Sequence, residues 1–373
     1  MHPTGKRLAV VAVVLAATTS TTAASGAAPD WRKVPHSATE ATLMDIAAIS
    51  GTDAWTVGTR QPPNDTGYPL AEHWDGTSWK EVPVPATPTG SGELAGVSAV
   101  SSDDVWAVGD STGLGPVLRH WDGTSWAAVA PAAPPAGEHP GADRLYDVAA
   151  VSKTRAWAVG LYSNWDNPGV LTLIESWDGQ KWSRLATPTP GLYGSTLQGV
   201  SAVSATDAWA VGWYLDGDQN VALALHWDGR AWTRSKMKLP AGNTELQGVT
   251  AVSANDVWAV GDNEGRPLAL HWDGRAWSVL PRPTMTSAWL RSAAPDGKGG
   301  MWAAGYQLTD EGVVSRPLFL HWNGKAWTVG TSEEPEGVVN GLARSGASIW
   351  AVGTTSPCPC FVAPPLVEIS GTQ

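Results

Sequence analysis

The residues with the clearest chemical potential stand at one recurring place, directly after an apolar residue, usually leucine, that opens a β-like segment. Two of these places carry a carboxylate, Asp45 and Asp147, where most of the others have glycine. Two carboxylates can act as a general acid and a general base if the pKa of one of them is raised. The residue pairs at this place are Met44-Asp45, Ala95-Gly96, Tyr146-Asp147, Gln198-Gly199, Gln247-Gly248, Arg291-Ser292 and Asn340-Gly341.

This set allows three interpretations. Asp45 and Asp147 could catalyse a reaction, the whole set could contact a ligand without chemistry, or the side chains could simply be solvated. A departure from a repeated local pattern is a reasonable place to look for function. The sequence therefore predicts ligand contact by Asp45, Tyr146, Asp147, Gln198, Gln247, Arg291 and Asn340.

A second set of candidates consists of aromatic residues outside the repeated positions. Flat aromatic faces beside Asp, Asn and Gln suit the apolar faces and hydroxyl groups of sugars, as in many small-ligand sites. The alternative is that these rings pack on one another and only cover one face of the protein. They are Tyr68, Tyr162, Trp165, Trp213, Tyr214, Tyr306 and Phe361 in loops within repeats, and Tyr193 and Trp289 in links between repeats.

Metal and cofactor motifs are weak. Asp216, Asp218 and Asn220 alternate as ligands do in calcium loops, but no downstream glutamate completes that motif, and a polar turn is the alternative. We find no phosphate loop, dinucleotide fingerprint, nucleophile elbow or zinc-protease motif. We therefore expect neither a metal nor a cofactor.

Five histidines each precede a repeated tryptophan: His73, His120, His226, His271 and His321. Even spacing around a ring would hold these histidines far apart, which favours a structural role over a shared metal site.

A tryptophan-rich repeat must position these candidates. A segment of the W-A-V-G type places its tryptophan at 55, 106, 157, 209, 258, 302 and 350, with spacings of 44 to 52 residues. An H-W-D-G segment and a further tryptophan five residues later recur six times. Each repeat predicts four strands, with Asp-Gly or Asn-Gly hairpins between the third and the fourth. Four-stranded units at this period are typical of propeller blades.

Two terminal fragments predict how the ring closes. Trp31–Val34 resembles the last strand of a repeat, although no first strand precedes it. Pro365–Ser370 resembles a third strand, and no fourth strand follows it. The simplest arrangement is a seven-bladed ring in which the N-terminal strand completes the last blade. Closure of this kind removes exposed sheet edges.

The repeat resembles the kelch-type propellers, the family that includes the galactose oxidase propeller. The matching elements are Trp258-Ala259-Val260-Gly261 and the six residues from Trp272 to Trp277. The resemblance covers Trp31 to about Ile369 and implies the architecture. It departs from that family by one glycine in place of a doublet and by tryptophan in place of tyrosine. No residue matches the copper ligands of galactose oxidase, so the resemblance does not imply that activity.

The remaining features concern location. Residues 1–28 contain Lys6 and Arg7, then the apolar run Leu8–Ala17, which predicts a secretory signal too short to span a membrane. Residues 29–373 then form one propeller domain.

The formal net charge of −11 disfavours binding to nucleic acid and to anionic membranes. Cys358 and Cys360 are separated by one residue and could form a strained disulfide or stay as two thiols.

Blade topology places the variable loops and the links between blades on one face of the disc, where functional residues are expected. We therefore expect a secreted, extracellular monomer that binds a glycan, another polymer or a small molecule on that face. An enzyme (lyase, hydrolase or cyclase) with its site at the mouth of the central channel is the first alternative. A scaffold for another secreted protein is the second, because one fold hosts many functions.

Overall fold

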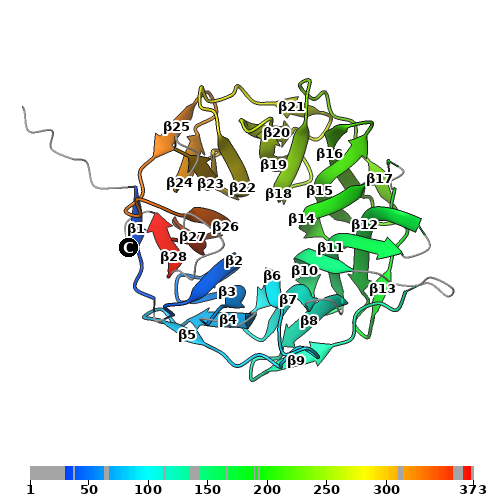
Figure 1. Ribbon diagram of the computed structural model, residues 1–373, viewed down its shortest axis with the longest axis vertical. Coiled ribbons are helices and arrows are strands. Elements are labelled where there is room, and N and C mark those ends of the chain that lie inside the picture. The colour runs from blue at the N-terminus through cyan, green and yellow to red at the C-terminus, as the bar shows by residue number, and fades with distance from the viewer. Residues whose placement is uncertain are drawn as a thin grey trace, which may run out of the picture.

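The computed structural model describes residues 30–36, 38–62, 67–111, 115–134, 143–164, 167–188, 190–191, 194–309, 314–355 and 364–370. Within these ranges the chain is all-β and forms seven four-stranded antiparallel sheets around a central axis (Figure 1). This confirms the predicted seven-bladed propeller. The predicted signal segment, both cysteines, Trp165, Tyr193 and Phe361 lie outside the described residues.

Six blades are built from consecutive strands, and the innermost strand comes first in the chain. The first three are β2 (Ala41–Ser50), β3 (Asp53–Arg60), β4 (Tyr68–Trp74) and β5 (Trp79–Glu81); β6 (Glu93–Ser101), β7 (Asp104–Ser111), β8 (Gly115–Trp121) and β9 (Trp126–Val129); β10 (Arg144–Ser152), β11 (Arg155–Asn164), β12 (Asn167–Trp177) and β13 (Trp182–Arg184). The next three are β14 (Ser195–Ser204), β15 (Asp207–Asp216), β16 (Gln219–Trp227) and β17 (Trp232–Arg234); β18 (Thr244–Ser253), β19 (Asp256–Asn263), β20 (Pro267–Trp272) and β21 (Trp277–Val279); β22 (Ala288–Pro295), β23 (Met301–Leu308), β24 (Ser315–Trp322) and β25 (Trp327–Gly330).

The seventh blade joins the two ends of the chain. It contains β26 (Val338–Ser345), β27 (Ser348–Thr354), β28 (Pro365–Ser370) and, at its outer edge, β1 (Trp31–Lys33). Trp31 pairs with Ser370 and Lys33 with Glu368, so the predicted ring closure is confirmed. The indole of Trp31 is fully buried and stacks on Phe319 of the sixth blade, with ring centroids 4.0 Å apart.

The repeated tryptophans pack blade against blade. Trp55 of the first blade lies 4.8 Å from Trp121 and 5.2 Å from Trp126 of the second, measured between ring centroids. Trp209 of the fourth blade makes the same contacts with Trp272 and Trp277 of the fifth. An aromatic ring buries roughly 150–250 Å², so these contacts account for much of the apolar interface between neighbouring blades. Their structural role, expected from the repeat, is confirmed.

The repeated histidines also have a structural role. The Nε2 atom of His73 lies 2.9 Å from Oδ1 of Asp53, and its ring packs on Trp55 with centroids 4.6 Å apart. Such histidine–carboxylate pairs occur in five of the seven blades, the first, second, fourth, fifth and sixth, and connect the third strand to the start of the second or, in the sixth blade, to the turn before it. Among the described residues, no three His, Cys, Asp or Glu side chains are placed to hold a metal. The other pairs are His120–Asp104, His226–Asp207, His271–Asp256 and His321–Asp296.

The residue at one position of the third strand contacts the link from the preceding blade. Two kinds of residue occupy this position. In the first, second, third and seventh blades this position carries a buried charged residue that binds the incoming link. In the fourth, fifth and sixth blades it carries leucine, which belongs to the apolar clusters against which Leu185, Met237, Leu239, Leu280 and Met285 of the links pack. The charged residues are Glu72, bound to His36; Arg119, bound to the carbonyl oxygens of Pro85 and Ala86; Glu175, bound to the backbone N–H of Ala132; and Glu368, bound to Ser332 and Glu333.

The buried Glu175 leads to a prediction of pH-dependent stability. Burial raises the pKa of its carboxyl from 4.5 to about 7. The folded protein therefore keeps a proton that the unfolded chain releases, and stability falls as the pH rises from about 4.5 to about 7. We expect Glu175→Gln, which keeps an acceptor for Ala132, to be more stable than the wild type by up to about 3 kcal/mol at pH 8.

Urea unfolding between pH 4 and pH 8 measures this effect. The gain should vanish below pH 4.5, where the wild-type carboxyl is protonated in both states. Glu336→Gln, at an exposed position, is the matched control and should follow the wild-type curve. A gain for Glu175→Gln that is equal at pH 4 and pH 8 would contradict this explanation.

Candidate functional site

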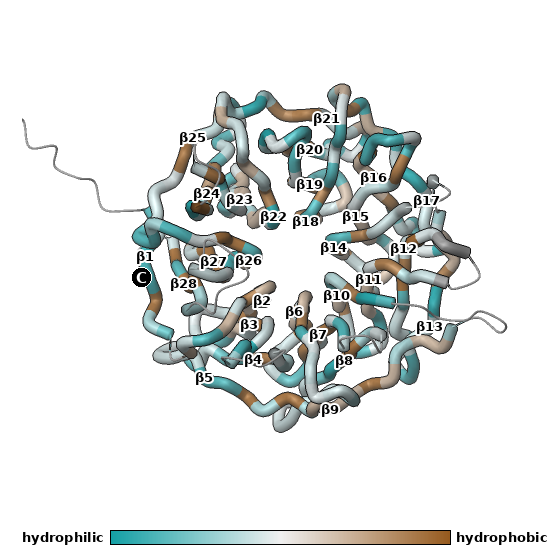
Figure 2. The backbone as a smooth tube through the Cα atoms, in the orientation of Figure 1, coloured by the Kyte–Doolittle hydropathy of each residue, from teal (hydrophilic) through white to brown (hydrophobic). Residues whose placement is uncertain are grey.

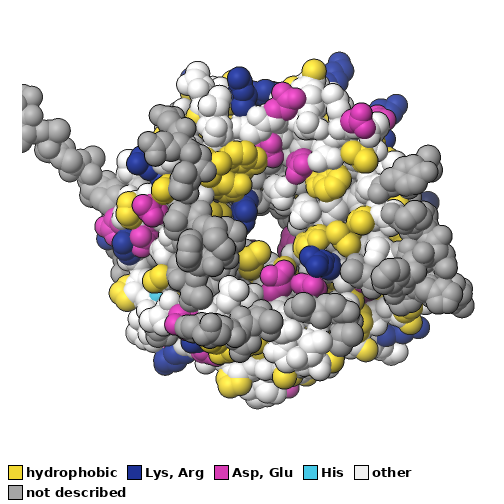
Figure 3. Space-filling view, in the orientation of Figure 1, with side chains coloured by type: hydrophobic (Ala, Val, Ile, Leu, Met, Phe, Trp, Pro, Cys, Tyr) yellow, Lys and Arg dark blue, Asp and Glu magenta, His cyan; other side chains and the backbone are white. Residues whose placement is uncertain are grey.

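A cavity of about 750 Å³ lies on the ring axis, where the inner strands begin. Figure 2 shows hydrophilic stretches at the axial ends of β14, β18 and β22, and Figure 3 shows acidic, basic and hydrophobic side chains around the central opening. The sequence-predicted residues that line the cavity are Asp45, Tyr146, Asp147, Gln198, Gln247, Trp289, Arg291, Tyr306 and Asn340.

The described part of the chain contains no helix that could span a membrane.

A β-bulge at the start of each inner strand directs one lining side chain per blade to the axis. In the fourth blade Leu197 pairs with Gly212 and Gly199 pairs with Val211, so Gln198 between them has no partner. A bulged residue bends its strand and re-aims its side chain. The same register shift occurs in all seven blades, and the residues that it leaves unpaired are Met44, Ala95, Tyr146, Gln198, Gln247, Arg291 and Asn340.

The bulge also explains the glycine that ends each W-A-V-G segment. A Cβ atom on Gly212 would lie 2.0 Å from the carbonyl oxygen of Thr196 on the bulged strand. No side chain fits at that distance, and equally close contacts, at 1.9 or 2.0 Å, exist in every blade. The glycine is therefore required by the close approach of two strands and not by an unusual φ.

The two carboxylates on the axis bridge neighbouring blades. Asp45 accepts a hydrogen bond from the backbone N–H of Val97 in the next blade (2.9 Å), and Asp147 accepts one from Val200 in its next blade (2.8 Å). Ser292 makes the equivalent bond to Leu342 (3.0 Å) with an uncharged side chain. The inter-blade bond itself therefore does not require a negative charge.

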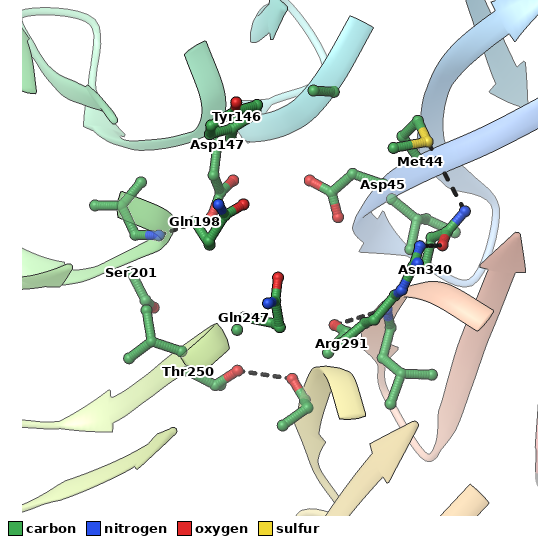
Figure 4. A pocket seen from close by; sticks show the side chains of 18 of the residues that line it. Met44, Asp45, Tyr146, Asp147, Gln198, Ser201, Gln247, Thr250, Arg291 and Asn340 are labelled. Carbon is green, nitrogen blue, oxygen red and sulfur yellow. Dashed lines mark hydrogen bonds between the residues drawn. The ribbon is translucent and has the colours of Figure 1, made fainter. Parts of the chain in front are cut away.

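Asp45 and Asp147 also interact with each other. They lie on either side of the second blade, and Figure 4 shows the carboxyl group of Asp45 on the side that faces Asp147. A Cβ atom on Gly96, between them, would lie 2.7 Å from the Cα of Asp147, so the intervening blade leaves no room for a side chain there. Burial raises the pKa of Asp45 to about 7. Burial, and then the negative charge of Asp45, raise the pKa of Asp147 well above its ordinary value.

The sixth blade carries the arginine of the cavity lining and two aromatic rings. Trp289 and Tyr306 stack with ring centroids 5.1 Å apart and an interplanar angle of 15°. The guanidinium of Arg291 lies 5.2 Å from the centroid of Tyr306 and donates to Oδ1 of Asn340 (2.5 Å). Asn340 in turn donates to the carbonyl oxygen of Leu43 (2.8 Å), so this part of the lining is tied to the first blade.

Three further carboxylates line the cavity and were missed in the sequence. Glu93 and Glu245 stand directly before the leucine of their inner strands, and Asp262 follows a W-A-V-G glycine. Burial raises the pKa of Glu93 and of Asp262, with smaller contributions from the nearby Asp110 and Glu245 respectively. A polar residue beside an otherwise apolar strand start was the signal that could have identified them.

Three aromatic candidates do not line the cavity. The ring of Tyr162 lies 4.7 Å from the guanidinium of Arg184, and the ring of Tyr214 lies 4.4 Å from that of Arg234. Tyr214 is 8% exposed and belongs to the apolar cluster between the third and fourth blades. Trp213 is half-buried on β15. The structure thus places Tyr162, Trp213 and Tyr214 on strands β11 and β15, and not in the loops where they were expected.

The possible calcium segment forms the turn between β15 and β16. Asp216 and Asp218 are exposed on either side of Gly217, whose φ is 61°. The side-chain amide of Asn220 donates to Oε1 of Glu245 (2.6 Å), which directs it toward the fifth blade. This segment is therefore an exposed polar turn that is tied to the fifth blade through Asn220.

Comparisons with known proteins bear on the fold. No protein-family model matches the chain, and no curated protein matches it. Among solved structures, Ycf48 bound to D1 peptide has a TM-score of 0.59 at 16% identity, over 92% of this chain and 96% of that one. A catalytically inactive virginiamycin B lyase from Staphylococcus aureus with quinupristin has a TM-score of 0.62 at 12% identity, over 92% and 99%. The WD40 propeller domain of Doa1 has a TM-score of 0.58 at 11% identity, over 92% and 98%. At these identities the likeness shows the fold alone: the chain is a seven-bladed β-propeller, and its kelch-type subfamily stays a prediction.

Proposed function

We propose that this protein is an exported propeller that binds an extracellular ligand, a glycan or a similar polar polymer, in the axial cavity. One observation carries the proposal: the variable residues at the start of the inner strands converge on a single cavity although they come from different blades. Its volume of about 750 Å³ lies within the usual range of ligand pockets. A packing role alone does not require polar side chains of so many kinds at one place.

The lining suits a sugar in particular. Gln198, Gln247 and Asn340 supply amide donors and acceptors, and carboxylates accept hydrogen bonds from hydroxyl groups. The stacked pair of Trp289 and Tyr306 offers an aromatic surface at the wall of the cavity. An extracellular glycan is a ligand that an exported protein would meet. The expectation of export rests on the predicted signal in residues 1–28.

Binding should depend on the cavity and not on the other aromatic candidates. We expect Trp289→Ala and Gln247→Ala each to weaken binding of the best oligosaccharide from a glycan array on the order of tenfold or more, because each removes a lining group. Trp213→Ala is the matched control, since Trp213 does not line the cavity, and its affinity should stay within about twofold of the wild type.

Calorimetric titration of the protein from residue 29 onward measures these affinities, and thermal melting verifies that each variant is folded. If no oligosaccharide binds, or if Trp213→Ala weakens binding as much as Trp289→Ala does, the proposal is wrong. Gln247→Ala provides an independent test if Trp289→Ala proves unstable, because the side chain of Gln247 makes a single, long hydrogen bond to the residues that the structure describes, 3.4 Å to Glu245.

Hydrolysis of the bound polymer is the second candidate function, favoured by the interacting pair Asp45 and Asp147. One protonated and one ionised carboxyl group are the requirement for acid–base cleavage of a glycosidic bond. In that case Asp45→Asn or Asp147→Asn should abolish turnover without lowering the melting temperature, because asparagine keeps an acceptor for the backbone N–H groups and removes a buried carboxyl group. Unchanged turnover in both variants would exclude this role.

A further inference from the structure

The charge of the axial cavity narrows the chemistry of its ligand. The described lining contains the five carboxyl groups of Asp45, Glu93, Asp147, Glu245 and Asp262, and Arg291 is the basic residue among them. Like charges in one partly desolvated space repel each other, and opposite charges brought near them are stabilised. The cavity is thus complementary to a positively charged group.

The nearby arginines already have partners. Arg291, two blades from Asp45 around the ring, is bound to Asn340 and packed on Tyr306. Arg144 is half-exposed, and its Nε atom lies 3.5 Å from Oδ2 of Asp110. The hydrogen bonds of the Asp45 and Asp147 carboxyl groups come from backbone N–H groups and not from a basic side chain, so an ammonium group of a ligand would supply the counter-charge that favours their ionised form.

The two axial charges are not explained by the fold. Ser292 forms the same inter-blade bond without a charge, and the second, fourth, fifth and seventh blades carry glycine at this position. Burying two interacting carboxyl groups costs stability, as the raised pKa values of Asp45 and Asp147 indicate. A cationic ligand would offset that cost, whereas a neutral ligand would not.

The rest of the lining favours an amino sugar over a lysine side chain. A lysine brings a stem of four methylene groups, which apolar walls would suit. The lining includes aliphatic residues such as Ile46 and Leu342, but its side-chain amides, Gln198, Gln247 and Asn340, match the hydroxyl groups around a sugar ring, which a lysine side chain lacks. The stacked Trp289–Tyr306 pair provides the one extended aromatic surface among the described lining residues.

The geometry points to a glycan with free, protonated amino groups as the ligand, bound with an ammonium group near Asp45 and Asp147. This inference rests on the proposed function and specifies its substrate class. Glucosamine polymers without acetyl groups are the simplest members of that class, and a neutral or N-acetylated polymer of the same length lacks the charge.

Four tetramers in calorimetric titrations near pH 7 separate the possibilities: glucosamine, N-acetylglucosamine, glucose and lysine. We expect the glucosamine tetramer to bind at least about tenfold more tightly than the two uncharged sugars, the order expected for one charge-assisted hydrogen bond. The double variant Asp45→Asn with Asp147→Asn should reduce that preference to near unity. Glu93→Gln is a second variant at the cavity wall, and it should reduce the preference in part. Asp218→Asn, on the exposed turn after β15, is the control and should keep the full preference.

Each other outcome has a distinct meaning. Equal affinities for the three sugars would overturn the amino-sugar inference and leave the proposed function standing. A preference that survives in the Asp45/Asp147 double variant would overturn the assigned position of the ammonium group. Binding of the lysine tetramer alone would overturn both proposals in favour of a basic peptide ligand, and the absence of all binding would overturn both.

Discussion

Replacing Trp31 by alanine is expected to lower the free energy of unfolding by about 3–5 kcal/mol, although Trp31 stands at the start of the described chain. The indole is fully buried between the seventh and sixth blades, where it stacks on Phe319 and meets Trp302 edge-on at 5.2 Å. Its removal leaves a cavity at the point where the ring closes. Because β1 pairs with β28 through only three residues, the loss of this anchor should also weaken the pairing itself.

Urea denaturation followed by far-ultraviolet circular dichroism measures the effect. Lys33→Ala, at a half-exposed position in the same strand, is the control and should change the free energy by less than about 1 kcal/mol. Trp31→Phe keeps an aromatic ring and should retain much of the stability. A change below about 1 kcal/mol for Trp31→Ala would show that β1 does not hold the ring closed.

Replacing Gly212 by alanine is expected to destabilise the protein by about 3 kcal/mol or more. The new Cβ atom would lie 2.0 Å from the carbonyl oxygen of Thr196 and 2.8 Å from the Cα of Leu197. Both atoms belong to the backbone of β14, so β14 and β15 must separate to make room. That movement would displace the bulged residue Gln198 from the cavity wall.

Gly51→Ala is the matched control, because no atom lies within 4 Å of the position of its Cβ atom. Its stability should equal or slightly exceed that of the wild type, since alanine restricts the unfolded chain more than glycine does. Thermal melting of the two variants side by side gives the comparison. If both variants melt within about 2 °C of each other, the steric explanation for the repeated glycines is wrong.

The repeat made much of the fold predictable. Tryptophans at regular spacing, with Asp-Gly hairpins between them, specify four short strands per unit, because each feature acts within one blade or between neighbours. The unpaired fragments Trp31–Val34 and Pro365–Ser370 specified the closure, since a lone outer strand and a missing outer strand can satisfy only each other. The same regularity identified Asp45 and Asp147 as exceptions.

The bulges could not be predicted from the residues themselves. Met44, Tyr146, Gln198 and Arg291 share no residue type, and a bulge is defined by pairing with another strand and not by local preference. The roles of Tyr162 and Tyr214 depended likewise on arginines of the outer strands, which only the assembled blade brings over their rings. The cavity-lining Glu93, Glu245 and Asp262 stand out in the sequence only as polar residues next to apolar strand segments, and their place on the cavity wall follows from the assembled ring.

The sequence by itself determined the number of blades, the way the ring closes and the recurring place from which side chains reach the axis. These properties follow from local spacing and from complementary ends. The tertiary structure alone decided that the carboxyl groups of separate blades share one partly desolvated space, and that the arginine there is held by Asn340 and Tyr306. Charges far apart in the chain influence each other only at the distance that folding sets, so the cavity's affinity for a cation is a property of the ring and not of any single repeat.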